Sequence, residues 1–335
     1  MIDRSDSGNA VDSNPLVTFA LFAYNQEKFI REAIRGAFSQ TYSPLEIILS
    51  DDCSSDKTFA IMKEMAAAYP GPHAVRVRAS AKNRGFAEHI NDVMREVRSE
   101  FIVLAAGDDI SNPARVQRLI DERLRHECKI MCIYSDVSTI NTEGAIIQEG
   151  GIHADRSGED LPHFMELPFW LGPSYAFDLA VYRELGSFLS DLKNEDYIIP
   201  FRTLLLGGRV AYIKESLVHY RIEVGHRRDE IRMRPTTRFL LENRRKEIVF
   251  NQMQNDLQKK SMDQLYRAVI EKHLSRVRCG IQLASKNVIC TLPICLNMLA
   301  RDPRGMVGLL RSFIAIGYPK FFNRYQRWKQ LIVSC

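Results

Sequence analysis

Two pairs of adjacent carboxylates in this sequence could help to bind a phosphorylated ligand. Asp51 and Asp52 open the acidic loop 51–58, and Asp108 and Asp109 form the second pair. Adjacent carboxylates can coordinate a hard divalent cation and leave positions free for a diphosphate, which is how Mg²⁺ or Mn²⁺ usually meets a nucleotide. A single Asp-Asp pair is more often a helix cap with a solvated charge, so the interpretation depends on where the pairs lie in the fold.

Short apolar runs alternate with amphipathic stretches over the first 150 residues, a pattern typical of βαβ units and a mostly parallel sheet. The pattern predicts strands at residues 16–24, 45–50, 74–79, 101–105 and 129–136. It predicts helices at residues 26–40, 57–69 and 86–97, and from the Asn112-Pro113 turn to about residue 126. Both carboxylate pairs then follow strand ends. Because ligands of open α/β sheets bind beyond the carboxyl ends of the strands, we expect the chemistry at this edge.

The rest of the chain divides into a continuation of this domain and a helical region. Residues 144–167 are polar and contain glycine, so we expect a loop or lid there, whereas 173–185, 195–206 and 210–221 resemble further elements of the same domain. Residues 231–280 favour long helices packed beside the body. The predicted organisation is a disordered N-terminus at 1–15, an α/β domain at 16–230 and a basic helical C-terminal region at 231–335.

Composition and cysteine usage exclude several classes of protein. The 335 residues are 45% hydrophobic and 26% charged, with 18 Gly and 13 Pro, which excludes a collagen-like or wholly disordered chain. Seven cysteines without zinc-binding spacing indicate reduced thiols and a cytosolic compartment. We expect no signal peptide in residues 1–15. We also expect no transmembrane segment, because the apolar run 288–300 is interrupted and shorter than about 20 residues.

Charge is distributed unevenly along the chain. Residues 1–230 hold 26 Lys and Arg against 35 Asp and Glu, a net charge of −9, whereas residues 231–335 hold 20 against 6, a net charge of +14. From residue 301, large apolar residues alternate with Arg and Lys, which fits either helices lying on an anionic membrane or an amphipathic helix packed on the core. No nucleic-acid recognition motif accompanies the charge. The residues that would enter a membrane are Phe313, Ile314, Phe321, Phe322, Tyr325 and Trp328.

A series of short motifs extends along residues 16 to about 135. The motifs are Tyr24-Asn25, Gln40-Thr41-Tyr42, the loop 51–58, Asn83-Arg84-Gly85 and Gly107-Asp108-Asp109. Their order and spacing resemble the inverting family 2 glycosyltransferases of GT-A fold, and the resemblance continues more loosely to residue 230. It implies a GT-A nucleotide-diphospho-sugar transferase fold for a catalytic domain at 16–230, followed by a helical appendage.

The resemblance also implies nucleotide-binding roles for the loops after the first two strands. Ala23, Tyr24 and Asn25 in the first loop and Asp52 in the second are the candidates. An ionised carboxylate only accepts hydrogen bonds, so Asp52 would select a base edge that offers a donor, such as N3–H of uracil or thymine. Arg84 matches a position near the nucleotide and could contact the diphosphate, although an ordinary surface arginine fits that position equally well.

In the family an Asp-x-Asp motif holds the ribose and the metal ion. Ala106 stands at the first Asp position here, so Asp108 and Asp109 are left to hold both the donor and a divalent metal, Mn²⁺ or Mg²⁺. The cation would act as a Lewis acid and offset the charge on the departing nucleoside diphosphate. The identity of a third ligand stays open, because a glutamate replaces the histidine that relatives often carry. The candidate substitutes are His219, Glu223 and His226.

An inverting transfer requires one base that takes the proton from the acceptor hydroxyl. Asn194-Glu195-Asp196 precedes a predicted helix and resembles the Glu-Asp motif of the family. The resemblance implies that Asp196 is the base and that Glu195 is its orienting neighbour. The same residues could instead cap the helix, since acidic residues favour first turns.

These observations predict a metal-dependent inverting glycosyltransferase that uses a UDP- or dTDP-sugar. The acceptor would be a lipid-linked glycan in cell-surface polysaccharide synthesis, of the O-antigen type, and the enzyme would be peripheral on the cytoplasmic face of the inner membrane. The alternative is a catalytically silent scaffold that binds a nucleotide sugar, because Ala106 and Glu223 depart from the family pattern. A dinucleotide-dependent oxidoreductase is excluded, since it needs a Gly-x-Gly-x-x-Gly turn and residues 23–27 contain no glycine.

Overall fold

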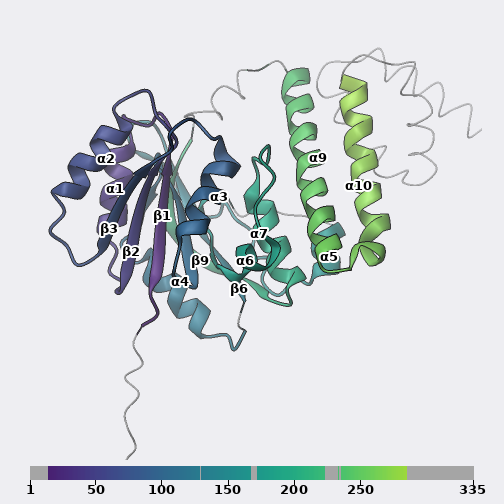
Figure 1. Cartoon of the computed structure of the whole chain (residues 1–335), viewed down its shortest axis with the longest axis horizontal. Coiled ribbons are helices and arrows are strands. Elements are labelled where there is room, and N and C mark those ends of the chain that lie inside the picture. The colour runs from purple at the N-terminus through teal and green to yellow at the C-terminus, as the bar shows by residue number, and fades with distance from the viewer. Residues whose placement is uncertain (1–13, 129, 167–171, 223–232, 234, 285–335) are drawn as a thin grey trace, which may run out of the picture.

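The computed structural model describes residues 14–128, 130–166, 172–222, 233 and 235–284. Within these residues a nine-stranded sheet carries helices on both faces, and two long helices stand side by side at the end remote from strand β3 (Figure 1). The strands are β1 (Val17–Ala23), β2 (Leu45–Asp51), β3 (Ala74–Ala79), β4 (Phe101–Ala106), β5 (Ile110–Ser111), β6 (Met131–Ile140), β7 (Ile146–Gln148), β8 (Ala176–Asp178) and β9 (Arg209–Arg221). The helices are α1 (Ile30–Phe38), α2 (Thr58–Ala67), α3 (Phe86–Glu96), α4 (Arg115–Leu124), α5 (Leu161–Glu166), α6 (Ala180–Leu185), α7 (Glu195–Leu205), α9 (Pro235–Lys259) and α10 (Asp263–Ala284), with a 3₁₀ turn η1 (Gly172–Ser174).

Four parallel strands form the part of the sheet that positions the candidate site. The strand order is β3-β2-β1-β4-β8-β6-β9-β5, and β7 pairs with β6. β1 lies between β2 and β4, with Ala23 opposite Asp51 and Phe22 opposite Ala106, so these three strands end at one edge. The predicted α/β architecture is confirmed. The second half of the sheet is mixed, because β8 runs antiparallel to β4 and β6.

Helices cover both faces of the sheet because its central strands are apolar on both sides. α1, α2 and α4 pack on one face, where Phe19 and Val103 are buried. α3, α5, α6 and α7 pack on the other face, where Ile102 and Phe177 are buried. The buried side of α1 has the spacing expected of an amphipathic helix. It consists of Ile30, Ala33, Ile34, Gly36 and Ala37.

The long helices α9 and α10 share this second core. Met253 on α9 and Leu274 on α10 are buried in it. Arg202 on α7 and Asp256 on α9 form a fully buried two-pronged ion pair with N–O distances of 2.7 and 3.0 Å. No helix in the described part of the chain is long and apolar enough to span a membrane. The basic segment 285–335, with its predicted membrane contacts, lies outside the described residues.

Residues 144–166 contain more structure than the expected loop or lid. β7 pairs with β6, and α5 packs into the core beside α7. The loop between them is fastened by Asp136, which lies at an irregularity of β6. Its carboxylate accepts main-chain hydrogen bonds from the amides of Val137 (2.9 Å), Gly151, Ile152 (3.0 Å) and His153 (3.1 Å). The expected loop is therefore limited to the residues between β7 and α5, and one buried carboxylate orders its main chain.

Candidate active site

The acidic loop after β2 is shaped by its own carboxylates. Asp51 accepts hydrogen bonds from the amide and the hydroxyl of Ser54 at 2.8 and 2.5 Å. Asp52 is only 3% exposed, and its two oxygens accept the amides of Arg84 and Gly85, each at 2.9 Å. Gly85 has a φ of +76°, a conformation that favours glycine, and it immediately precedes α3. Asp52 thus fixes the start of α3, while each of its oxygens keeps a second lone pair for a ligand.

The loop after β1 is bound to the loop after β2. Ala23 accepts the amide of Asp52 at 3.0 Å, and Asn25 accepts the amide of Ser55 at 2.8 Å through its side-chain oxygen. Asn25 has a φ of +52°, which asparagine tolerates better than most residues. The predicted nucleotide-binding residues therefore do meet at one place. Asn25 braces the loops, whereas Tyr24 remains 43% exposed and presents its ring at the surface.

Arg84 points toward α3. Its guanidinium lies 3.3 Å from Glu88 and 3.3 Å from Asp92, with about a third of the side chain exposed. Its predicted contact with a diphosphate stays a prediction. Asp56 accepts the amide of Thr58, the first residue of α2, at 2.9 Å, and so forms an Asx turn just before the N-cap residue Lys57.

Asp108 and Asp109 lie in the tight turn that follows β4. The amide of Gly107 donates to the carbonyl of Phe22 at 2.8 Å, and a Cβ at Gly107 would lie 2.8 Å from the Cβ of Ala23, so only glycine fits there. Asp109 is 6% exposed, whereas Asp108 is partly exposed. Burial raises the pKa of Asp108. Burial and then the neighbouring charge of Asp108 raise the pKa of Asp109 well above its ordinary value.

This carboxylate pair fits a hard divalent cation. Two adjacent carboxylates in a poorly solvated turn repel each other, and a bound Mg²⁺ or Mn²⁺ would stabilise their ionised forms through oxygen ligands. Among the described residues, no three His, Cys, Asp or Glu side chains gather to hold a metal, so His219 does not join the pair. His219 lies on β9 opposite Ile110. Glu223 and His226 lie outside the described residues.

The second acidic group, Glu195 and Asp196, forms the first turn of α7. Burial, and then the charge of Asp196, raise the pKa of Glu195 to about 8, and Glu195 accepts a hydrogen bond from the Tyr175 hydroxyl at 2.7 Å. Burial raises the pKa of Asp196 to about 7. The Oδ1 atom of Asp196 is buried and has no hydrogen-bond partner within the part of the chain that the structure describes. Asn194, which precedes α7, makes no side-chain capping bond, so that residue does not support the capping alternative.

Residues 172–175 form hydrogen bonds with residues of both α7 and β4. Tyr175 accepts the amide of Leu104 at 3.5 Å through its carbonyl and holds Glu195 through its hydroxyl. Arg115, fully buried on α4, donates to the carbonyls of Leu104 at 2.9 Å and Pro173 at 3.2 Å. Tyr175 and Arg115 were not found from the sequence. No motif marks them, and their buried side chains are brought to the site only by tertiary packing.

Comparisons with known proteins find related sequences. Residues 18–157 match the family model "Glycosyl transferase family 2". The chondroitin synthase of Escherichia coli is 34% identical over 137 residues, which cover 41% of this chain and 19% of that protein. The succinoglycan biosynthesis protein ExoO of Rhizobium meliloti is 28% identical over 225 residues, which cover 64% of this chain and 63% of that protein. The matched segment thus spans less than two thirds of either relative.

Solved structures share the fold at low sequence identity. S. aureus TarS residues 1–349, in complex with UDP-GlcNAc, superposes with a TM-score of 0.54 at 15% identity and covers 89% of this chain and 91% of that chain. The mannosyltransferase PcManGT from Pyrobaculum calidifontis, in complex with GDP-Man and Mn²⁺, has a TM-score of 0.52 at 16% identity over 92% of this chain and 89% of that chain. The fold is the GT-A fold. Over residues 18–157, less than half of the chain, the sequence is similar to glycosyltransferase family 2.

Proposed function

We propose that this protein transfers a sugar from a nucleoside-diphosphate donor to an acceptor hydroxyl, with inversion at the anomeric carbon and with a divalent cation as cofactor. One observation carries the proposal. The carboxylate pair Asp108 and Asp109, which fits a cation, follows β4, and Tyr175 bonds both Leu104 of β4 and Glu195, the neighbour of Asp196, a largely buried carboxylate with a pKa of about 7. A base with a pKa near the working pH is well matched to proton abstraction.

In the proposed reaction the donor lies across the ends of β2, β1 and β4. The nucleobase of the donor contacts Tyr24 and Asp52, and the diphosphate of the donor lies at Asp108 and Asp109. When bound there, the cation would neutralise charge that develops on the leaving diphosphate. Asp196 takes the proton of the acceptor hydroxyl, whose oxygen forms a bond to the anomeric carbon from the face opposite the diphosphate. The anomeric C–O bond to the diphosphate breaks, and its electron pair leaves with the nucleoside diphosphate.

The proposed donor is a UDP- or dTDP-sugar. Asp52 supports this choice because its oxygens, already bonded to two amides, can only accept a further hydrogen bond, and uracil and thymine offer N3–H. The fold itself does not select the base, since the neighbours of similar fold were solved with UDP-GlcNAc and with GDP-Man.

The proposed acceptor is a growing glycan of cell-surface polysaccharide synthesis, carried on a lipid at the cytoplasmic face of the membrane. The relatives support the polysaccharide part, because one is a chondroitin synthase and another a succinoglycan biosynthesis protein. The basic residues of 231–335 are the proposed contact with anionic lipid. Co-sedimentation with phosphatidylglycerol vesicles tests this contact, and binding that is absent at low salt contradicts it.

Donor hydrolysis is the test of the proposed function. Purified protein is incubated with Mn²⁺ and a panel of UDP-, dTDP- and GDP-sugars, and the release of nucleoside diphosphate is followed. Asp109→Ala and Asp196→Asn should lose the activity, whereas Asp191→Asn, an exposed acidic residue just before α7, should keep it. Nucleotide binding without turnover, even with membrane lipid and glycan acceptor added, would instead establish the silent scaffold.

A further inference from the structure

Arg221 is the last residue of β9, and its guanidinium is completely buried. It has no role in the proposed transfer reaction. Buried arginines are rare unless their charge and donors are matched by partners. The partners of Arg221 come from four separate segments of the chain: the turn after β4, the connection from β6 to β7, α1, and the residues just before α1. This convergence calls for a functional explanation.

Two of its bonds hold the turn that carries the carboxylate pair. The Arg221 amide donates to Oδ1 of Asp109 at 2.8 Å, and its Nε donates to the carbonyl of Asp108 at 2.9 Å. β5 begins directly after this turn and pairs with β9, Ile110 lying opposite His219. The position of both carboxylates therefore depends on the end of β9.

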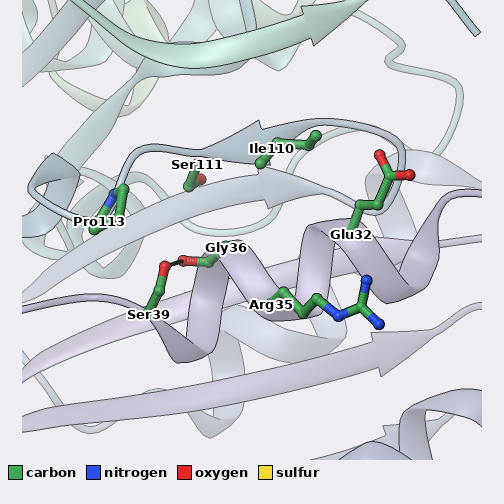
Figure 2. Close-up of a pocket in the computed structure, with 7 residues that line it drawn as sticks. All are labelled: Glu32, Arg35, Gly36, Ser39, Ile110, Ser111 and Pro113. Carbon is green, nitrogen blue, oxygen red and sulfur yellow. Dashed lines mark hydrogen bonds between the residues drawn. The ribbon is translucent and has the colours of Figure 1, made fainter. Parts of the chain in front are cut away.

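The remaining donors tie Arg221 to elements outside the turn. Nη1 donates to the carbonyls of Asn141 at 2.7 Å and Thr142 at 3.1 Å. Nη2 donates to Glu32 at 2.6 Å, and the guanidinium lies 4.7 Å from the ring centre of Phe29. Figure 2 shows Glu32 on α1, beside Ile110 at the start of β5, where it lines a shallow groove. Lysine cannot make this set of bonds, because only the planar guanidinium offers five donors in a fixed fork.

We propose that Arg221 is a positioning residue that holds Asp108 and Asp109 in the geometry required for a divalent cation and the donor diphosphate. The inference rests on the proposed function, since it concerns the same carboxylate pair. Its positive charge also offsets part of the repulsion between these two carboxylates and Glu32.

The test compares two buried arginines. Arg202 is a matched control, because its side chain is equally buried and bonds both Asp256 and the carbonyl of Gly186. Its guanidinium lies 4.6 Å from the ring centre of Phe188. Arg202 is also far along the chain from Asp108 and Asp109. Arg221→Lys and Arg202→Lys are prepared in the full chain. Mn²⁺ is titrated calorimetrically into each protein in the presence of UDP, and the melting temperature is measured in parallel.

Both substitutions should lower the melting temperature. Only Arg221→Lys should weaken Mn²⁺ binding, by about tenfold or more, the scale found when residues that orient metal ligands are removed. Glu32→Gln, at a side chain that is 44% exposed, provides a milder variant that should fold normally and weaken Mn²⁺ binding to a smaller extent.

An unchanged Mn²⁺ affinity in Arg221→Lys overturns the inference while leaving the proposed function intact. If Arg221→Lys does not fold, Glu32→Gln decides, and an affinity equal to that of the wild type counts against the inference. A wild-type protein that binds no Mn²⁺ in the presence of UDP refutes the metal-dependent function, and the inference falls with it.

Discussion

Replacing Glu195 with glutamine should leave most of the activity, whereas replacing Asp196 with asparagine should remove it. With a pKa of about 8, Glu195 is about 90% protonated at pH 7, and glutamine resembles that neutral form. The side-chain carbonyl of the introduced glutamine could still accept the Tyr175 hydroxyl. We expect a loss below about threefold for Glu195→Gln, because the dominant protonation state is reproduced. Asp196→Asn removes the base and should reduce kcat/KM by roughly 10²–10⁴.

The pH dependence gives this prediction a magnitude. A base with a pKa of about 7 is ionised to about 10% at pH 6, half at pH 7 and about 90% at pH 8. Because only the ionised carboxylate accepts a proton, kcat/KM should rise about fivefold from pH 6 to pH 7 and less than twofold from pH 7 to pH 8. Glu195→Gln should keep this acid limb, since its base is unchanged.

The assay is the release of nucleoside diphosphate from the donor identified in the panel, at saturating Mn²⁺ and between about pH 5.5 and about pH 9. Melting temperatures of the three proteins serve as the folding control. A rate that does not change between pH 6 and pH 8 would falsify the reasoning. So would an inactive Glu195→Gln beside an active Asp196→Asn, which would make Glu195 the base.

Three further predictions concern stability and donor binding. Arg202→Ala removes the two-pronged partner of the buried Asp256 and leaves it only Gln252 at 3.1 Å and Lys259 at 3.6 Å, so urea unfolding should show a loss of up to about 3–5 kcal/mol, and a loss below about 1 kcal/mol would contradict the role of the pair. Tyr24→Ala should weaken UDP binding by about tenfold through lost stacking and leave the melting temperature unchanged, and equal UDP affinity in calorimetry would exclude Tyr24 from the base site. The folded-state pKa of Asp196 lies above its unfolded value, so its contribution to stability is complete below about pH 4 and is lost as the pH rises through about 7. The melting temperature of the metal-free wild type should therefore fall relative to that of Asp196→Asn between pH 5 and pH 8, and a constant difference would refute this linkage.

Much of the proposed binding site for the nucleotide-sugar donor could be predicted from the sequence. The alternation of apolar and amphipathic segments predicts β1, β2, β3 and β4 within one or two residues, because β1, β2 and β4 are short apolar runs, β3 alternates apolar residues with arginine, and a turn follows each strand. Asp52 and Asp108 then fall beyond the parallel strands β2 and β4, and Tyr24 follows β1, which lies between these two strands. The ordered segment around β7 and α5 was missed, since its order depends on Asp136, whose four amide partners cannot be read from local periodicity.

The sequence by itself determined the chemistry that is available: carboxylates at strand ends, a glycine where no side chain fits, and an acidic pair before a helix. These features are local, because strand periodicity and turn composition act over a few residues. The tertiary structure decided which of them act together. Only packing brings Tyr175 against Glu195, buries Asp196 so that its pKa rises to about 7, and closes β9 with Arg221 on the turn of Asp109. Burial and long-range hydrogen bonds set these properties, and both depend on segments that are distant in the chain.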